Sequence, residues 1–387
     1  MSTGLLSRGI MKIESNIESL ATEHWKAPTV MATVGPTLEK PDDLRRAIEA
    51  GARWFRLPCG YRDRPHIDNA RAVRLAAAQV GIPVDLLLDL PSSRPRTGVM
   101  QELRLATGDR VLFWDPEVSP NAPAQPQASP VPLPGLAQLL KQVKPRHRMW
   151  FCDGRLSFIV ESTAESSLVA RMEEGMIPLK SSNSIFLPDS PSPFATITPQ
   201  DHELLSMMAQ DGVLPDWVAL SLIDSPEDVT AGRKAVRELL GRDVRIMAKF
   251  ETAFAVQSAR QIIGEADGIM VARGDLGLAI GYLRLPEVQE RLVKAARRAG
   301  KVAIVATQVL EMFAQTGIPQ RAELSDLSLV ARQRADAVML GKETVFSPRP
   351  IECIHLAQEV LAHETRRFEK SARSSATNPA KTRPAGK

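Results

Sequence analysis

Short apolar runs alternate with amphipathic stretches along most of this 387-residue chain. Runs rich in β-branched residues and leucine predict about eight strands, at residues 29–35, 54–58, 83–90, 217–223, 244–250, 268–272, 302–307 and 337–341. Between most of them lie helical patterns with start signals, such as KPDDLRRAIEAG and SPEDVTAGRKAVRELLG, and several end at a glycine (Gly51, Gly241, Gly300). This alternation predicts an α/β fold, a closed (β/α)8 TIM barrel of parallel strands.

One interval breaks the alternation. Residues 99–195 follow the third strand and are far longer than an ordinary βα loop. They contain strand-like pieces of their own (DRVLFW, HRMWFCDG, RLSFIVES, SSLVARM) and a proline-rich stretch, SPNAPAQPQASPVPLPG, which we expect to be a linker or surface loop. The pattern therefore predicts a small inserted β domain at 99–195, flanked by barrel segments at 1–98 and 196–370.

The charge distribution argues against a nucleic-acid partner. The formal net charge is +4, but residues 366–387 carry seven Lys/Arg against one Glu, so the remainder of the chain is close to −2. The last segment, 371–387, has the composition of a disordered basic tail. With 44% hydrophobic and 24% charged residues, the rest is typical of a globular protein.

The cysteine pattern and the hydropathy of the chain indicate the cellular compartment of the protein. Cys59, Cys152 and Cys353 are odd in number, widely spaced and form no CxxC pair, which argues against disulfides or structural zinc. No apolar run reaches the roughly 18 residues needed to span a bilayer, and no signal-peptide pattern opens the chain. We therefore expect a cytoplasmic protein with no membrane partner.

Polar residues gather where the predicted strands end. In a barrel of this kind, chemistry concentrates at the carboxyl ends of the strands, so these residues would form one rim. Each also has a simpler interpretation, as an ion pair, a helix cap or a solvated side chain. The rim residues are Arg56, Asp89, Lys249, Glu251, Arg273, Gly274, Asp275, Thr307 and Glu343.

Lys249 and Glu251 stand two apart at a strand end, so their side chains share a face. With Asp275 from the next strand, they suit a divalent metal and an anionic substrate. Two carboxylates are typical of Mg²⁺, and the lysine would stabilise negative charge on a phosphoryl or enolate oxygen. A Lys–Glu ion pair at the rim is the simpler alternative.

Several segments resemble the pyruvate kinase family in order and spacing, over about residues 27 to 370. The segments are MATVGPTLEKPDDLRRAIEAGARWFRL, LLLDLPSSRPRTG, MAKFET, DGIMVARGDLGLAI, VAIVATQVLEMF and RAELSDLSLVARQRADAVMLGKETVFSPRPIE. The elements MVARGDLG, ATQ-L and R-AE-SD are the most specific. The resemblance implies phosphoryl transfer between phosphoenolpyruvate and ADP, giving pyruvate and ATP.

The resemblance also implies residue roles. Glu251 and Asp275 would hold Mg²⁺ or Mn²⁺, and Lys249 would stabilise the transferring phosphoryl group. The backbone of Ala272, Arg273, Gly274 and Asp275 would bind phosphoenolpyruvate together with Thr307, with Lys249, Arg56 and Thr307 as catalytic residues. Arg56 and Arg96 would contact phosphate, and Arg96, Thr33 and Pro36 would lie on the nucleotide side.

Several departures from the family pattern stand out. After the second strand, Pro58, Gly60 and Tyr61 replace two potassium ligands and a histidine near the nucleotide. Leu90 replaces the threonine after Asp89, and Arg94 stands where the family has a glutamate, so Asp89 and Arg94 mark a remnant monovalent-cation site. A guanidinium can replace the ion electrostatically, so K⁺ should not be required.

The lysine-rich stretch of the inserted domain reads LKSSNSIFLP, which leaves Lys180 as the candidate replacement. The family's C-terminal domain has no counterpart, so effector regulation of that kind should be absent, and a homo-oligomer would form through barrel contacts. Two function classes stay open. One is an active kinase with ADP or another acceptor. The other is a catalytically weak paralogue that binds a small phosphorylated or oxo-acid ligand.

Overall fold

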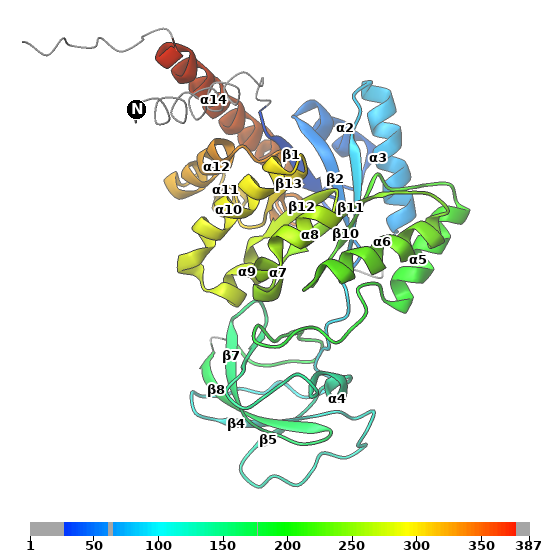
Figure 1. Cartoon of the computed structure of the whole chain (residues 1–387), viewed down its shortest axis with the longest axis vertical. Coiled ribbons are helices and arrows are strands. Elements are labelled where there is room, and N and C mark those ends of the chain that lie inside the picture. The colour runs from blue at the N-terminus through cyan, green and yellow to red at the C-terminus, as the bar shows by residue number, and fades with distance from the viewer. Residues whose placement is uncertain (1–26, 61–64, 176, 377–387) are drawn as a thin grey trace, which may run out of the picture.

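Eight parallel strands close into a barrel in the computed structural model, which describes residues 27–60, 65–175 and 177–376. Around the barrel the strand order is β1-β14-β13-β12-β11-β10-β3-β2 (Figure 1). The bounds are β1 (Thr29–Thr33), β2 (Ala52–Pro58), β3 (Asp85–Leu90), β10 (Trp217–Leu220), β11 (Arg245–Phe250), β12 (Gly268–Ala272), β13 (Val302–Ala306) and β14 (Ala337–Leu340). Each predicted run overlaps one of these strands, so the predicted barrel is confirmed.

Helices surround the barrel, and their ends follow the sequence signals. The α6 helix begins with a capping box, in which Ser225 and Asp228 bond to each other's backbone N–H, and ends at Gly241 in the left-handed region (φ 66°). The helices of the barrel are α2 (Pro41–Glu49), α3 (His66–Val80), α5 (Pro199–Gln210), α6 (Pro226–Leu240), α7 (Ala253–Gln257), α8 (Ala259–Glu265), α9 (Arg273–Ile280), η1 (Tyr282–Arg284), α10 (Leu285–Arg298), α11 (Glu311–Thr316), α12 (Arg321–Gln333), α13 (Lys342–Val345) and α14 (Pro350–Ala376).

Large side chains fill the barrel interior. Met31, Trp54, Trp217, Met247 and Met339 belong to one buried cluster, and the Trp54 and Trp217 rings lie 5.3 Å apart between centroids. The opposite face of each strand packs against the helices in a larger apolar cluster. The interior is therefore a packed core rather than a channel.

Polar side chains lie directly above this core. Strand side chains alternate in direction, so the residue two positions beyond an inward-facing one also faces inward. Two positions beyond Met31, Trp54, Leu87, Ala219 and Met247 stand Thr33, Arg56, Asp89, Ser221 and Lys249. The same periodicity that buries the core thus places a polar layer at the carboxyl ends of the strands.

The inserted domain has a separate sheet and core. Its strands lie in the order β5-β4-β8-β7-β6-β9, and Phe113, Phe151 and Phe158 pack against one another in its core. The bounds are β4 (Arg110–Trp114), β5 (Ser129–Pro132), α4 (Leu136–Leu139), β6 (Arg148–Phe151), β7 (Leu156–Thr163), β8 (Ser167–Gly175) and β9 (Ile185–Phe186).

Two expectations need correction. The proline-rich stretch is not only a loop, because Ser129–Pro132 forms strand β5 beside β4. This strand lies at the edge of the sheet, where a proline without an N–H is tolerated. The basic tail is not disordered throughout, since α14 continues to Ala376. The first helix-breaking residue after this point is Pro379, and residues 377–387 lie outside the described part of the chain.

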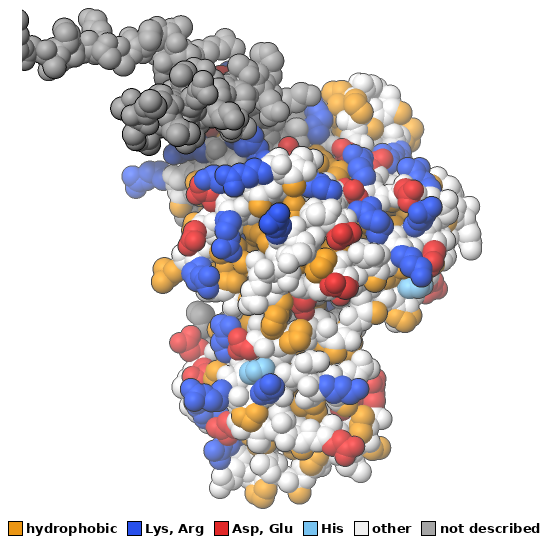
Figure 2. Space-filling view, viewed as in Figure 1, with side chains coloured by type: hydrophobic (Ala, Val, Ile, Leu, Met, Phe, Trp, Pro, Cys, Tyr) orange, Lys and Arg blue, Asp and Glu red, His pale blue; other side chains and the backbone are white. Residues whose placement is uncertain are grey.

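The inserted domain docks on α9. Phe186 packs against Leu278 and Ala279, and the Arg148 Nη2 atom donates to the Ala279 carbonyl at 3.3 Å. On the face in Figure 2, acidic and basic side chains are interspersed over both parts of the molecule. Among the described helices, none combines the length and apolar composition that a membrane crossing requires.

Candidate active site

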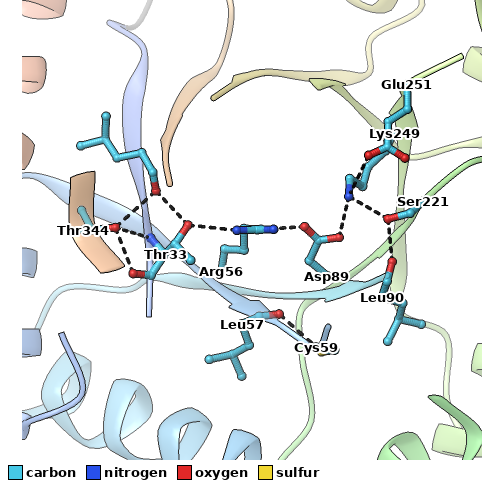
Figure 3. Close-up of polar contacts among 11 residues, drawn as sticks. Thr33, Arg56, Leu57, Cys59, Asp89, Leu90, Ser221, Lys249, Glu251 and Thr344 are labelled. Carbon is cyan, nitrogen blue, oxygen red and sulfur yellow. Dashed lines mark hydrogen bonds and ion pairs between the residues drawn. The ribbon is translucent and has the colours of Figure 1, made fainter. Parts of the chain in front are cut away.

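A chain of polar contacts at the barrel mouth joins residues of β1, β2, β3 and β11 with Ser221, which follows β10 (Figure 3). The Arg56 guanidinium donates to Asp89 Oδ2 at 2.6 Å and reaches Thr33 Oγ1 at 3.4 Å. On the other side of Asp89, Lys249 Nζ donates to Oδ1 at 3.0 Å. The ammonium also donates to Ser221 Oγ at 2.7 Å and lies 3.2 Å from Glu251 Oε1. The polar layer is thus one connected network.

The network fixes the charge of its two central groups. Burial alone would raise the pKa of Asp89, but the Lys249 and Arg56 charges outweigh it and hold that pKa below its usual value of 3.8. Burial would lower the pKa of Lys249, but Asp89 and Glu251 outweigh it and raise that pKa above its usual 10.5. Both groups are therefore ionised at neutral pH, with a cation held at the floor of the mouth.

A cavity of about 330 Å³ opens above this network. Arg56, Lys249, Glu251, Ala272, Gly274, Asp275 and Thr307 line it, as do Thr33, Asp89, Asp153, Tyr282, Glu311, Lys342, Glu343 and Phe346. The structure therefore brings most of the predicted rim residues around one space. We call this space the rim cavity.

Thr307 carries two marks of a binding residue. Its backbone is held at φ 73° and that of Gln308 at φ 54°, in the left-handed region that non-glycine residues rarely adopt. Its hydroxyl is buried and has no hydrogen-bond partner among the described residues. A Cβ added to Gly274 would lie 3.9 Å from that hydroxyl, so the two residues lie side by side in the cavity lining. A buried hydroxyl without a hydrogen-bond partner is suited to bond a polar atom of a ligand.

Two predicted rim residues support the loops instead. The Arg273 side chain is turned away from the cavity, bonds both carboxylate oxygens of Asp326 at 2.7 Å and donates to the Thr307 carbonyl at 2.5 Å. Glu343 lines the cavity but accepts from the backbone N–H groups of Val309 and Leu310 at 3.0 and 3.1 Å. Both side chains hold the loop after β13 in its strained form, so any contact of Arg273 with a ligand would come from its backbone.

Arg94 forms an ion pair with Asp275 and not with Asp89. Its two terminal nitrogens donate to Asp275 Oδ1 at 3.1 Å and Oδ2 at 2.7 Å. The guanidinium also lies 5.4 Å from the centroid of the Phe186 ring. The pKa of Asp275, which burial alone would raise, is lowered by this neighbour. The two residues predicted as one cation-site remnant are thus separate: Asp89 is neutralised by Arg56 and Lys249, and Arg94 neutralises Asp275.

Sequence reasoning missed several residues at the cavity mouth. Asp153 belongs to the turn between β6 and β7 of the inserted domain and reaches the cavity with its backbone at φ 56°. Gly154 lies so close to α9 that an added Cβ would meet Leu278 at 2.4 Å. The pair Asp-Gly signals a turn in the sequence, but nothing in it indicates contact with the barrel. Tyr282 is the first residue of η1, Lys342 is the first residue of α13, and Phe346 directly follows α13.

The residues expected on the nucleotide side lie mostly outside the cavity. Arg96 is exposed and donates to the Ser182 carbonyl at 3.0 Å, and Pro36 is exposed. Thr33 lines the cavity, but its hydroxyl donates to the Leu340 carbonyl at 2.8 Å. Lys180 pairs with Glu102 at 3.0 Å on the surface of the inserted domain. Tyr61 lies outside the described residues.

The donor set fits a small divalent cation. Glu251 and Asp275 line the same cavity, and a carboxylate has about four acceptor positions, so both keep unused ones beside their present partners. Six carboxylate side chains and three cationic ones line the cavity, so negative charge must be balanced before an anion enters. The described residues hold no cluster of three or more His, Cys, Asp or Glu side chains poised around a metal, and Mg²⁺ does not need one because it keeps several waters.

Fold and site together define a (β/α)8 barrel with a polar rim cavity and a β domain inserted after the third strand. A family model described as the barrel domain of pyruvate kinase matches residues 25–354. The chain belongs to the pyruvate kinase family.

Individual relatives agree with this assignment. A pyruvate kinase of Methylorubrum extorquens is 32% identical over 84% of this chain and 66% of its own length. A pyruvate kinase of Thermococcus litoralis is 30% identical over 88% of this chain and 70% of its own. A crystal structure of a pyruvate kinase from Cryptosporidium parvum has a TM-score of 0.80 at 23% identity, covering 92% of this chain and 74% of the other, which supports the fold. The chain spans about two thirds of the first relative, and 55% of pyruvate kinase 2 of Synechocystis.

Proposed function

We propose that this protein transfers a phosphoryl group between phosphoenolpyruvate and ADP in a Mg²⁺-dependent reaction. The observation that carries the proposal is the placement of a charged Lys249, the Glu251 and Asp275 carboxylates and the open Thr307 hydroxyl around one cavity. A protein that only binds an anion has no need of both the lysine and the two carboxylates. Because the reaction uses water-soluble metabolites, we extend the proposal to the cytoplasm, and an oligomer would form through barrel contacts.

In the proposed reaction, the bond between phosphorus and the enol oxygen breaks while a bond to a terminal ADP oxygen forms. The enolate then takes a proton to become pyruvate. Negative charge spreads over the phosphoryl oxygens during transfer, and a fixed cation nearby lowers the barrier. Lys249 suits this role because Asp89, Ser221 and Glu251 hold its ammonium in place. Arg56, fixed by Asp89, supplies a second cation for the phosphate.

The loops after β12 and β13 would position the remaining part of the substrate. Gly274 leaves its Cβ position open beside Thr307, so the substrate carboxylate can approach the backbone at the start of α9. The Thr307 hydroxyl would bond the same ligand. A bound Mg²⁺, held by Glu251 and Asp275, would supply the positive charge that balances the substrate's anionic groups.

The deciding experiment is a coupled assay of pyruvate formation from phosphoenolpyruvate with Mg²⁺ and a panel of nucleoside diphosphates. We expect turnover with ADP that disappears when Mg²⁺ is chelated. Absence of pyruvate with every diphosphate tested would contradict the proposal.

A second candidate is phosphoryl transfer to another acceptor. It is favoured by the placement of Arg96, Pro36 and Lys180 away from the cavity lining. The cavity mouth presents instead the exposed side chains of Tyr282, Lys342 and Phe346. The same assay with added small phosphate acceptors separates this candidate from a nucleotide-dependent enzyme.

A further inference from the structure

Asp275, a proposed metal ligand, has both oxygens bonded to Arg94. The two bonds are 3.1 and 2.7 Å long and pair two donors with two acceptors, an arrangement stronger than a neutral hydrogen bond. Both side chains are mostly withdrawn from solvent, at 20% and 24% exposure, so water screens the pair only partly. Among the described residues, no guanidinium pairs with Glu251, whose Oε1 lies 3.2 Å from Lys249 Nζ and whose Oε2 accepts from the Leu222 N–H. The two proposed ligands therefore differ in partner: Glu251 is held by groups of the barrel, and Asp275 by an arginine next to the inserted domain.

The backbone that follows Arg94 is hydrogen-bonded to the base of the inserted domain. The Pro95 carbonyl accepts from the Ile185 N–H at 3.1 Å. Thr97 and Asn183 exchange bonds, from Thr97 N–H to the Asn183 carbonyl at 3.0 Å and from Asn183 N–H to Thr97 Oγ1 at 2.9 Å. Phe186, next along this segment, lies under the Arg94 guanidinium.

Asp275 belongs to the barrel, on the first turn of α9. The ion pair therefore joins the inserted domain to a proposed metal carboxylate. Close to the Arg94–Asp275 pair, the contact of Phe186 with Leu278 and Ala279 joins the inserted domain to the barrel. A rotation of the inserted domain that undocks Phe186 would carry Arg94 away from Asp275.

We propose that Arg94 acts as a latch, competing with a divalent cation for Asp275 until the guanidinium withdraws with the inserted domain. The inference rests on the proposed function only in its choice of Mg²⁺ or Mn²⁺ as the ligand. It adds that the position of the inserted domain sets the affinity of the barrel for a divalent cation. Coupling of this kind is reciprocal, so occupancy of the carboxylates loosens the inserted domain by the same free energy.

The test is a titration of the full chain with Mn²⁺ alone, followed by the paramagnetic resonance of free Mn²⁺. Three proteins are compared with the wild type. R94Q removes the guanidinium, R94K keeps the charge but cannot bond both oxygens in the same planar geometry, and R245Q removes an arginine that pairs with Asp85 at the opposite end of the barrel. Thermal melting checks that each variant is folded.

The latch predicts an order of affinities. R94Q binds Mn²⁺ about tenfold more tightly than the wild type, equivalent to about 1.4 kcal/mol. R94K falls between the two, and R245Q equals the wild type. If R94K equals the wild type, the charge alone matters and the latch is wrong. Equal binding by all four proteins, or no binding by any, also overturns it.

A second measurement uses the wild type alone. Mg²⁺ should increase amide hydrogen exchange in residues 95–97 and 183–186, where the base of the inserted domain is held. Saturation with Mg²⁺ and no change in these segments would contradict the coupling. Neither measurement contains phosphoenolpyruvate. Failure of the pyruvate assay with the expected Mn²⁺ order would therefore refute the proposed function and leave the latch standing.

Discussion

Lys249 and Asp89 are 160 residues apart in sequence, and yet the Lys249 ammonium lies 3.0 Å from the Asp89 carboxylate at the centre of the barrel mouth. Asp89 also accepts from Arg56, so one carboxylate holds two cations in a space where neither is well hydrated. This shared carboxylate organises the floor of the rim cavity, and several predictions concern it.

Asp89→Ala should destabilise the fold strongly. It leaves Arg56 and Lys249 facing each other without the shared carboxylate, and removing one partner of a buried pair costs about 3–5 kcal/mol. Denaturant titration measures the loss. The control is Glu290→Ala, which removes an exposed i,i+4 partner of Lys294 and should change the free energy of unfolding by less than about 0.5 kcal/mol. Equal effects of the two substitutions would contradict a central role for Asp89.

The contribution of Asp89 should depend on pH. Its pKa is lower in the folded protein than the usual 3.8, so the unfolded chain binds the proton more readily. The stabilisation is complete above about pH 5 and is lost as the pH falls through 3.8 towards the folded pKa. The difference in unfolding free energy between wild type and Asp89→Asn should therefore shrink from about pH 5 to about pH 3. A constant difference over this range would show that the charge of Asp89 is not what stabilises the fold.

Lys249→Met should abolish most turnover while leaving the metal site. The ammonium acts on charge that develops in the transition state, so we expect turnover to fall by about 10³-fold or more. Mn²⁺ binding should persist, because Glu251 and Asp275 remain. Steady-state kinetics and Mn²⁺ titration measure the two properties separately. Parallel loss of both would instead indicate that Lys249 maintains the structure of the site.

The inserted domain should be required for phosphoryl transfer but not for folding of the barrel. Its apolar core is separate from that of the barrel, and its Asp153 reaches the rim cavity. Replacing residues 99–195 by a short linker should leave a cooperative thermal transition with no pyruvate formation, because water would then enter the cavity. Full activity in this deletion variant would show that the inserted domain is not required for phosphoryl transfer.

Turnover should require Mg²⁺ and be insensitive to K⁺. Arg94 supplies a permanent positive charge beside the cavity, since its pKa is raised above the usual value although burial alone would lower it. Arg94→Glu should remove most activity, at least tenfold, and added K⁺ should not restore it. The assay compares K⁺ with Na⁺ at equal ionic strength. Strong activation of the native protein by K⁺ would refute this role.

Local patterns in the sequence predicted the barrel and most of its rim. The alternation of side chains along a strand and the start signals of helices involve only residues that are close in sequence. The eight strands and the inward direction of Arg56, Asp89 and Lys249 can therefore be inferred from the sequence alone. The strand ends also predicted Glu251, Gly274 and Thr307 as rim residues, and all three line the cavity.

The pairing of side chains depends on contacts between segments that are distant in the sequence. Arg94 follows β3 on a linker without periodicity, so the direction of its side chain depends on how the inserted domain docks, and it meets Asp275 across 181 residues. Asp153 reaches the cavity for the same reason, because the turn that carries it packs on Leu278. Arg273 stands in a motif that suggests a ligand contact, but its long side chain finds Asp326 and three carbonyls behind the rim. A local pattern determines the position of a residue in its strand or loop. Contacts between distant segments determine the direction and the partner of a long side chain.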